Sequence, residues 1–125
     1  MTLSIKSLNK LIGVDPRLVS VIKTSSELSP IHFEVTEGVR SFSRQKMLFD
    51  AGKSQTMSSR HLTGDAVDLV ILIDGVAHWE FNSYRALSEI IKKVAIVQGV
   101  DLEWGGDFPT FKDGVHFQLK RKVKL

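Results

Sequence analysis

The sequence contains no cysteine among its 125 residues. A chain without cysteine forms no disulfide and offers no thiolate to a metal ion, so a metal site in it would have to use histidine and carboxylate side chains. The absence also leaves the redox compartment open, because such a chain tolerates both the cytoplasm and an oxidising space.

Long hydrophobic runs are also missing. The longest apolar run, residues 67–73, is interrupted by Asp68 and is too short to span a bilayer. The first eleven residues mix two lysines with polar and apolar residues and lack the apolar core of a secretory signal. We therefore expect no signal peptide and no stable membrane insertion.

The composition has no strong bias, with 42% hydrophobic and 25% charged residues, which excludes a disordered or collagen-like chain. The length fits one domain, residues 1–125, with a single hydrophobic core. The formal net charge is only +3, and much of the basic excess lies near the C-terminus at Lys120, Arg121, Lys122 and Lys124. This tail is either a solvated terminus or a contact for an anionic polymer; without an aromatic-and-basic stripe we expect no nucleic-acid partner.

Hydrophobic periodicity and capping residues predict three helices. They lie at Asp15–Ser29, at Ser41–Gly52 with Phe42, Met47 and Leu48 facing inward, and from Asn82 or Ser83 to Gly99. Alternating apolar residues predict strands at 31–35, 68–73, 76–79, 100–104 and 115–119, with a hairpin turn at Asp74-Gly75. This order predicts an α+β fold: a small, mostly antiparallel sheet with helices packed on one face.

Three polar residues stand out because they interrupt apolar segments or adjoin turns. His61 and Asp68 flank a turn containing Gly64, and His116 lies on the opposite face of its strand from its apolar neighbours. Two histidines and one carboxylate form a common catalytic zinc set with one position open to water. Taken singly, each histidine could be a hydrogen-bonded structural residue, and Asp68 could cap a strand or pair with an arginine.

These residues fall within three sequence blocks. They are Ser59-Arg60-His61-Leu62-Thr63-Gly64-Asp65-Ala66-Val67-Asp68, Trp104-Gly105-Gly106-Asp107-Phe108 followed by Asp113-Gly114-Val115-His116-Phe117, and Glu37-Gly38-Val39-Arg40-Ser41 with Gln45. Together they closely resemble the M15 family of zinc peptidases, the D-alanyl-D-alanine carboxypeptidase and L-alanyl-D-glutamate endopeptidase group, and within it the compact bacteriophage endolysins. The resemblance covers about residues 33–119.

The resemblance implies a role for each matched residue. It implies that His61, Asp68 and His116 bind one Zn²⁺ ion. Asp113 occupies the position of the catalytic carboxylate, where many relatives have glutamate. The resemblance also places Arg40 beside the scissile carbonyl and gives Ser59 a part in substrate binding.

Other interpretations of these residues stay open at this point. Asp113 could be a turn residue, and Arg40 could pair with Glu34 or Glu37. Asp65 and Asp107 are loop caps, solvated charges or ligands of a second ion such as calcium. We expect Trp104 to lie in the core and pocket wall, and His32 and His78 to be surface or strand residues.

The resemblance implies a monomeric peptidoglycan peptidase that cuts the stem peptide between L-alanine and the following γ-linked D-residue. It would wait in the host cytoplasm until a holin opens the membrane and then act on the periplasmic cell wall. The alternatives are a D-alanyl-D-alanine carboxypeptidase and a metal-binding module without catalysis.

Overall fold

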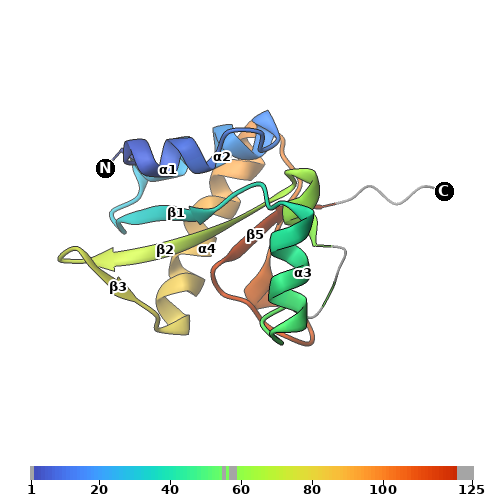
Figure 1. The fold of residues 1–125 in the computed structure, drawn as a ribbon. Coiled ribbons are helices and arrows are strands. Elements are labelled where there is room, and N and C mark those ends of the chain that lie inside the picture. The colour runs from blue at the N-terminus through green and yellow to red at the C-terminus, as the bar shows by residue number, and fades with distance from the viewer. Residues whose placement is uncertain (1, 55, 57–58, 121–125) are drawn as a thin grey trace.

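The computed structural model describes residues 2–54, 56 and 59–120. The described residues form four α-helices, five strands and two short 3₁₀ turns (Figure 1). In chain order these are α1 (Ile5–Lys10), α2 (Pro16–Leu28), β1 (Phe33–Glu37), α3 (Phe42–Asp50), η1 (Arg60–Thr63), β2 (Ala66–Ile73), β3 (Val76–His78), α4 (Phe81–Gln98), β4 (Leu102–Trp104), η2 (Gly105–Asp107) and β5 (His116–Leu119). The α+β class is confirmed.

The five strands form one sheet in which β2 is the longest strand and pairs with three others. The order is β1-β2-β5-β4. Strand β3 follows the Asp74-Gly75 turn and pairs with the C-terminal end of β2. All of these pairings are antiparallel. The hairpin prediction is confirmed: Asp74 and Gly75 both have positive φ, at 52° and 76°, as a type I′ turn requires.

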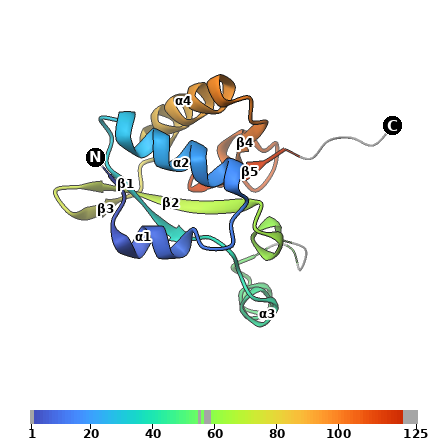
Figure 2. The same ribbon diagram turned by 90° about the horizontal axis from the view of Figure 1, so that it is seen from above.

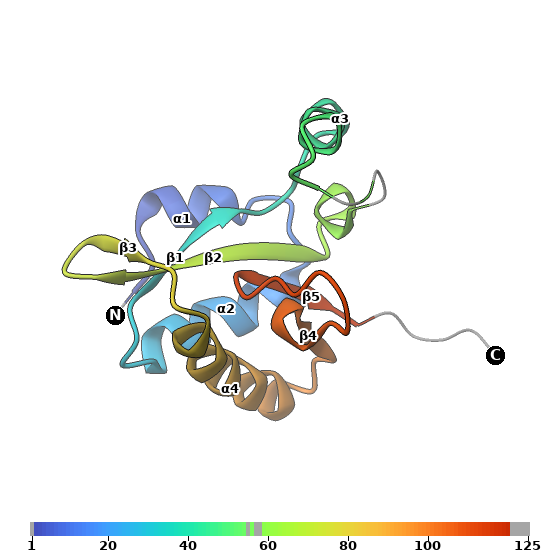
Figure 3. The ribbon, with the colours of Figure 1, turned by 90° about the horizontal axis from the view of Figure 1, so that it is seen from below.

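Helices α2 and α4 pack on each other and cover one face of the sheet, whereas α3 stands away from the body on the opposite side (Figures 2 and 3). The core lies between the sheet and these two helices. Its fully buried side chains include Leu18, Val21 and Ile22 of α2 and Leu87 and Ile91 of α4. These residues recur at the helical spacing from which the two helices were predicted.

Sequence reasoning missed α1 because it has only six residues and a weak apolar pattern. A contact from a distant strand stabilises it: the Glu34 carboxylate of β1 accepts hydrogen bonds from Ser4 N at 2.9 Å and Ser7 Oγ at 2.7 Å. The predicted start of α4 was also wrong, because the helix begins at Phe81 rather than after Asn82 or Ser83. Its end at Gly99, in the left-handed conformation, is confirmed.

The predicted inward face of α3 was wrong. Phe42 and Met47 are 65% and 67% exposed, and the only buried residue of α3 is Gln45. The Gln45 side chain accepts from Arg40 Nη1 at 2.6 Å and donates to Ser54 Oγ at 2.8 Å. A polar contact with the neighbouring loop, rather than the hydrophobic core, therefore sets the orientation of this helix.

Within the described residues, no helix is long and apolar enough to cross a membrane. Of the basic tail, Arg121, Lys122 and Lys124 lie outside the described residues.

Candidate metal centre

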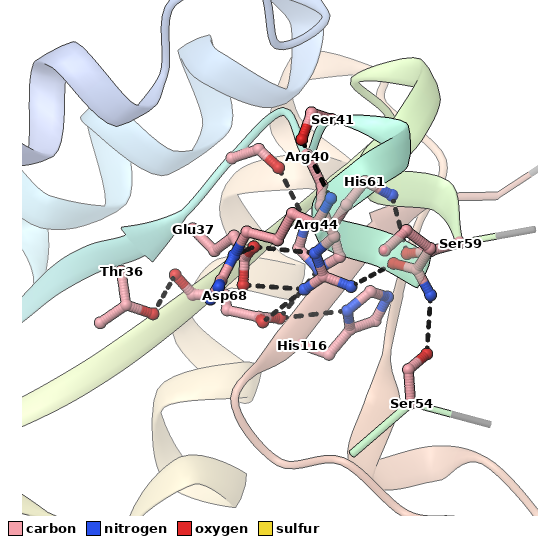
Figure 4. A network of polar contacts seen from close by, with 12 residues as sticks. Thr36, Glu37, Arg40, Ser41, Arg44, Ser54, Ser59, His61, Asp68 and His116 are labelled. Atoms are coloured by element: carbon pink, nitrogen blue, oxygen red, sulfur yellow. Dashed lines mark hydrogen bonds and ion pairs between the residues drawn. The ribbon is translucent and has the colours of Figure 1, made fainter. Parts of the chain in front are cut away.

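His61, Asp68 and His116 come together at one point of the fold, beside the end of the sheet near α3 (Figure 4). One potential ligand atom from each side chain lies within 4.8 Å of the other two, so the group could hold a metal ion. His61 lies in the 3₁₀ turn η1, Asp68 in β2 and His116 at the start of β5. Among the described residues, no other group of His, Cys, Asp and Glu has this arrangement.

The sheet register brings two of the three residues together. Asp68 is the third residue of β2, not the first as predicted, and its partner on β5 is His116. Val67 and Leu69 on either side of it are fully buried in the core. Because side chains alternate along a strand, Asp68 projects from the other face, toward the two histidines.

The third residue, His61, is held by its turn and by one backbone contact. Ser59 caps the turn, with its Oγ accepting from His61 N at 3.2 Å. The ring Nδ1 donates to the carbonyl oxygen of Gly38 at 2.8 Å, since a carbonyl can only accept. Nε2 therefore faces Asp68 without a proton in the neutral ring, as a metal ligand requires.

The close approach of Gly38 depends on its lack of a side chain. A Cβ there would lie 1.9 Å from the carbonyl oxygen of Lys10. The glycine of the Glu37-to-Ser41 block thus positions His61 indirectly, by allowing its own carbonyl to reach the ring.

The site favours a positive charge next to Asp68. Burial disfavours the Asp68 carboxylate, yet the hydrogen bonds and positive charge that the His116 and His61 rings supply in their protonated forms outweigh that effect and hold its pKa well below the usual range. Burial likewise opposes a charge on His116, but Asp68 and Gln118 raise the pKa of His116. A divalent cation would supply the same positive charge directly to the three ligand atoms.

Arg40 borders the three residues and is held in place from two sides. Its Nε and Nη2 donate to the Glu37 carboxylate at 2.8 Å each, and Nη2 lies 3.8 Å from Asp68 Oδ2 (Figure 4). Of the two ion pairs that the sequence offered for Arg40, the one with Glu37 is therefore present. Glu34 instead accepts hydrogen bonds from residues of α1 and its cap. The Arg40 side chain is only 8% exposed, so its guanidinium is fixed beside the cluster.

Asp113 lies on the loop before β5 and lines the same cleft as the three potential ligands. Partial loss of solvent around the carboxyl and the negative charge of Asp68 raise the pKa of Asp113. The loop is anchored at Gly105, whose carbonyl accepts from Asp113 N at 3.0 Å. The arrangement places a second carboxyl near the cluster without making it part of the three-residue group.

The two glycines after Trp104 are required by close packing. A Cβ at Gly105 would lie 2.3 Å from the Asp113 carbonyl oxygen, and one at Gly106 would lie 2.2 Å from the Trp104 ring. Trp104 is fully buried, and its Nε1 donates to the Gly114 carbonyl at 2.7 Å. This block thus shapes the Asp113 loop. Trp104 lies in the core as expected, but it is not among the residues that line the cleft, so its expected place in the pocket wall was wrong.

The cleft has a volume of about 760 Å³ and extends from the cluster between α3 and the Asp113 loop. Its outer walls include Leu48 and Lys53 on one side and Phe108 and Phe111 on the other. Sequence reasoning did not single out these residues as site residues, because loop aromatics and a lysine carry no pattern that assigns them to a cleft.

The other polar residues that the sequence analysis named make contacts with side chains of the same chain. Asp107 pairs with Lys92 at 2.6 Å, and Asp65 accepts from Thr63 Oγ1 at 3.0 Å. His32 lies 3.6 Å from Glu34, and His78 Nε2 lies 2.8 Å from Ser83 Oγ. None of these residues belongs to the three-residue cluster.

Comparison with known proteins places this geometry in context. Residues 1–122 match the model of the family described as phage L-alanyl-D-glutamate peptidase. The chain is 32% identical over 119 residues to the L-alanyl-D-glutamate peptidase of Listeria phage A118, covering 95% of this chain but only 41% of that protein.

Two solved structures share the fold. The Serratia marcescens L-Ala D-Glu endopeptidase ChiX is 43% identical, with a TM-score of 0.89 over 96% of this chain and 90% of that one. The D,D-pentapeptidase VanY of a VanB-type resistance cassette, solved with Zn(II), has a TM-score of 0.58 over 85% of this chain and 72% of that one; at 17% identity it shows the fold alone. From the family match over nearly the whole chain and the likeness to ChiX, the chain belongs to the phage L-alanyl-D-glutamate peptidase family.

Proposed function

We propose that this chain is a zinc-dependent peptidoglycan endopeptidase that cuts stem peptides between L-alanine and D-glutamate. The observation that carries the proposal is the convergence of His61, Asp68 and His116 beside a cleft that also contains Asp113 and Arg40, in a member of this family. The L-alanyl-D-glutamate peptidase of phage A118 and the L-Ala D-Glu endopeptidase ChiX both act on this kind of bond, which supports the choice of bond.

The donor set fits zinc. Two imidazoles and one carboxylate are a common catalytic zinc set, and three protein ligands leave one position open. VanY, which shares the fold, was solved with this metal. A bound zinc ion would supply a Lewis acid that polarises the scissile carbonyl and makes water more acidic. We propose one ion, held by His61 Nε2, an Asp68 carboxylate oxygen and His116 Nδ1.

The other residues of the cleft would handle protons and charge. Asp113 would accept a proton from the attacking water and pass it to the leaving amine, a task suited to its raised pKa. The Arg40 guanidinium, fixed by Glu37 and Gln45, would stabilise the negative charge that develops on the carbonyl oxygen. Ser59, which lines the cleft, would help to bind the substrate, and its Oγ also holds the turn that presents His61.

The family points to a lytic role in a phage life cycle. We propose that the protein acts as a monomer on the periplasmic cell wall, after a holin releases it from the host cytoplasm. Binding of nucleic acid forms no part of this role. The open end of the cleft between α3 and the Asp113 loop would accept the extended stem peptide.

Digestion of isolated peptidoglycan tests the proposal. The purified protein is incubated with wall material with and without a chelator, and the released peptides are identified by mass spectrometry. We expect fragments that begin with D-glutamate, their loss with chelator, and their return after zinc is added. Release of terminal D-alanine alone would instead identify a carboxypeptidase, and metal binding without any release would identify a non-catalytic module.

A further inference from the structure

The outer side of the His116 ring meets a pair of polar side chains that the proposed mechanism does not use. His116 Nε2 lies 2.8 Å from Gln118 Oε1, while its Nδ1 faces Asp68 at 3.2 Å. Gln118 Nε2 in turn donates to Glu103 Oε1. A chain of contacts therefore runs from Glu103 on β4 through Gln118 on β5 to the potential ligand.

The sheet register builds this chain. Gln118 lies opposite Glu103, and His116 lies opposite Asp68, so the four side chains cross three adjacent strands. His116 and Gln118 are two residues apart on β5 and project from the same face. Both are only 9% exposed, which limits competition from water for these contacts.

The direction of each hydrogen bond follows from the chemistry of Glu103. An ionised carboxylate can only accept, so the Gln118 amide must turn its NH₂ group toward Glu103 and its oxygen toward His116. The amide oxygen of Gln118 can also only accept. In the neutral His116 ring the proton must therefore be on Nε2, the nitrogen that faces this oxygen. Nδ1 is then the nitrogen left to bind a cation beside Asp68.

We infer that Gln118 and Glu103 are positioning residues that hold the proton on His116 Nε2 and thereby present Nδ1 to the metal. This inference rests on the proposed role of the three side chains as zinc ligands. His61 has a simpler arrangement, because the Gly38 carbonyl fixes its proton on Nδ1. The two histidines therefore present different ring nitrogens, each selected by the acceptor on its other side.

Zinc affinity, measured by competition with a chelator of known affinity, tests this inference on the whole protein. Loss of an outer hydrogen-bond partner of a ligating histidine costs about 10- to 100-fold in metal affinity, so we expect Gln118→Leu to fall in that range. Glu103→Gln should lower zinc affinity less than Gln118→Leu does. An amide at position 103 can both donate and accept, so it no longer fixes which way the Gln118 amide points. Glu89→Gln, an exposed change on α4, is the matched control and should bind zinc as the original protein does.

An exchange of the two side chains gives a sharper test. Gln118→Glu alone places two carboxylates face to face and should weaken zinc binding. Combined with Glu103→Gln, the new carboxylate accepts from both His116 Nε2 and the amide at 103, so affinity should return to near the original value. Failure of the double variant to improve on Gln118→Glu would overturn the inference.

Nitrogen-15 NMR of histidine in the zinc-loaded protein reads the ring directly. We expect zinc on Nδ1 of His116 and a slowly exchanging proton on Nε2, with faster exchange of that proton in Glu103→Gln. Zinc on Nε2 would overturn the inference even if Gln118→Leu fails to fold. If zinc binds as described but no wall peptide is released, the proposed function fails while this inference stands.

Discussion

His116 and Asp68 lie directly opposite each other on β5 and β2, with 3.2 Å between Nδ1 and Oδ1. They are 48 positions apart in the chain, and the antiparallel pairing of two strands brings them together. His61 joins them from the turn just before β2. Two of the three proposed ligands are thus held by the sheet itself, which should make the site stable without the metal.

Replacing His61 should remove metal binding while leaving the sheet intact. His61→Ala deletes one of three proposed ligands, and the turn that carries it keeps its Ser59 cap. We expect the zinc content of the purified protein, measured by atomic emission, to fall from about one per chain to near zero. His32→Ala, outside the cluster, should retain its zinc. Full zinc content in His61→Ala would refute the ligand assignment.

Replacing Asp113 should separate catalysis from metal binding. Asp113→Ala keeps all three proposed ligands but removes the proposed proton carrier. Peptide release should therefore fall by about 10²- to 10⁴-fold with normal zinc content, the usual contribution of a general base. Asp101→Ala, on the loop before β4, is a matched carboxylate control and should keep its activity. A loss of zinc in Asp113→Ala would show that this residue acts as a ligand instead.

Arg40→Lys tests whether the planar guanidinium matters beyond its charge. Lysine cannot reproduce the forked contact with Glu37 together with the bond to Gln45. We expect urea denaturation to give a loss of about 1–3 kcal/mol in the free energy of unfolding. Turnover at saturating substrate should also fall, with zinc content unchanged. A stability loss with full turnover would make Arg40 purely structural.

Glu34, at a distance along the sheet from the proposed ligands, should make the stability of the fold depend on pH through its contacts with α1. Burial disfavours its charge, but hydrogen bonds from Ser7 and Ser4 outweigh this and lower the pKa of Glu34. A carboxyl whose pKa is lower in the folded than in the unfolded chain stabilises the fold above its ordinary pKa of 4.5. This stabilisation is lost as pH falls through the lower, folded-state value.

The variant Glu34→Gln should therefore be less stable than the original protein by about 1–2 kcal/mol at pH 7. The difference should shrink below about pH 4 in urea titrations at a series of pH values. The exposed Glu89→Gln serves as control and should track the original protein throughout. A difference that stays constant down to acid pH would rule out a role for the Glu34 charge.

Gly106→Ala should destabilise the protein because its Cβ would overlap the buried Trp104 ring. Overpacking of this kind costs about 1–3 kcal/mol. Gly75→Ala is a useful comparison, since it has positive φ but no atom within 4 Å of the new Cβ. Thermal unfolding should show a larger loss for position 106. Equal losses would mean that overlap with Trp104 costs no more than the backbone strain of alanine at the positive φ of position 75.

Local signals in the sequence located the long elements, although they misplaced the start of α4. The Asp15-Pro16 start of α2, the Asp74-Gly75 turn and the Gly99 end of α4 were all found where predicted, because each depends on the backbone preferences of one or two residues. Helices α1 and α3 were harder. A contact with Glu34 helps to hold α1, and the buried face of α3 carries a glutamine rather than apolar residues.

The sequence by itself determined the fold class, the family blocks and the residue types of the proposed metal centre, because these depend on periodicity, capping and the order of chemical groups. Only the tertiary structure decided which ring nitrogen faces Asp68, that Arg40 is clamped by Glu37, and that Gln118 and Glu103 support His116. These contacts depend on strand register and close packing between distant segments, and no local pattern in the chain encodes such distances.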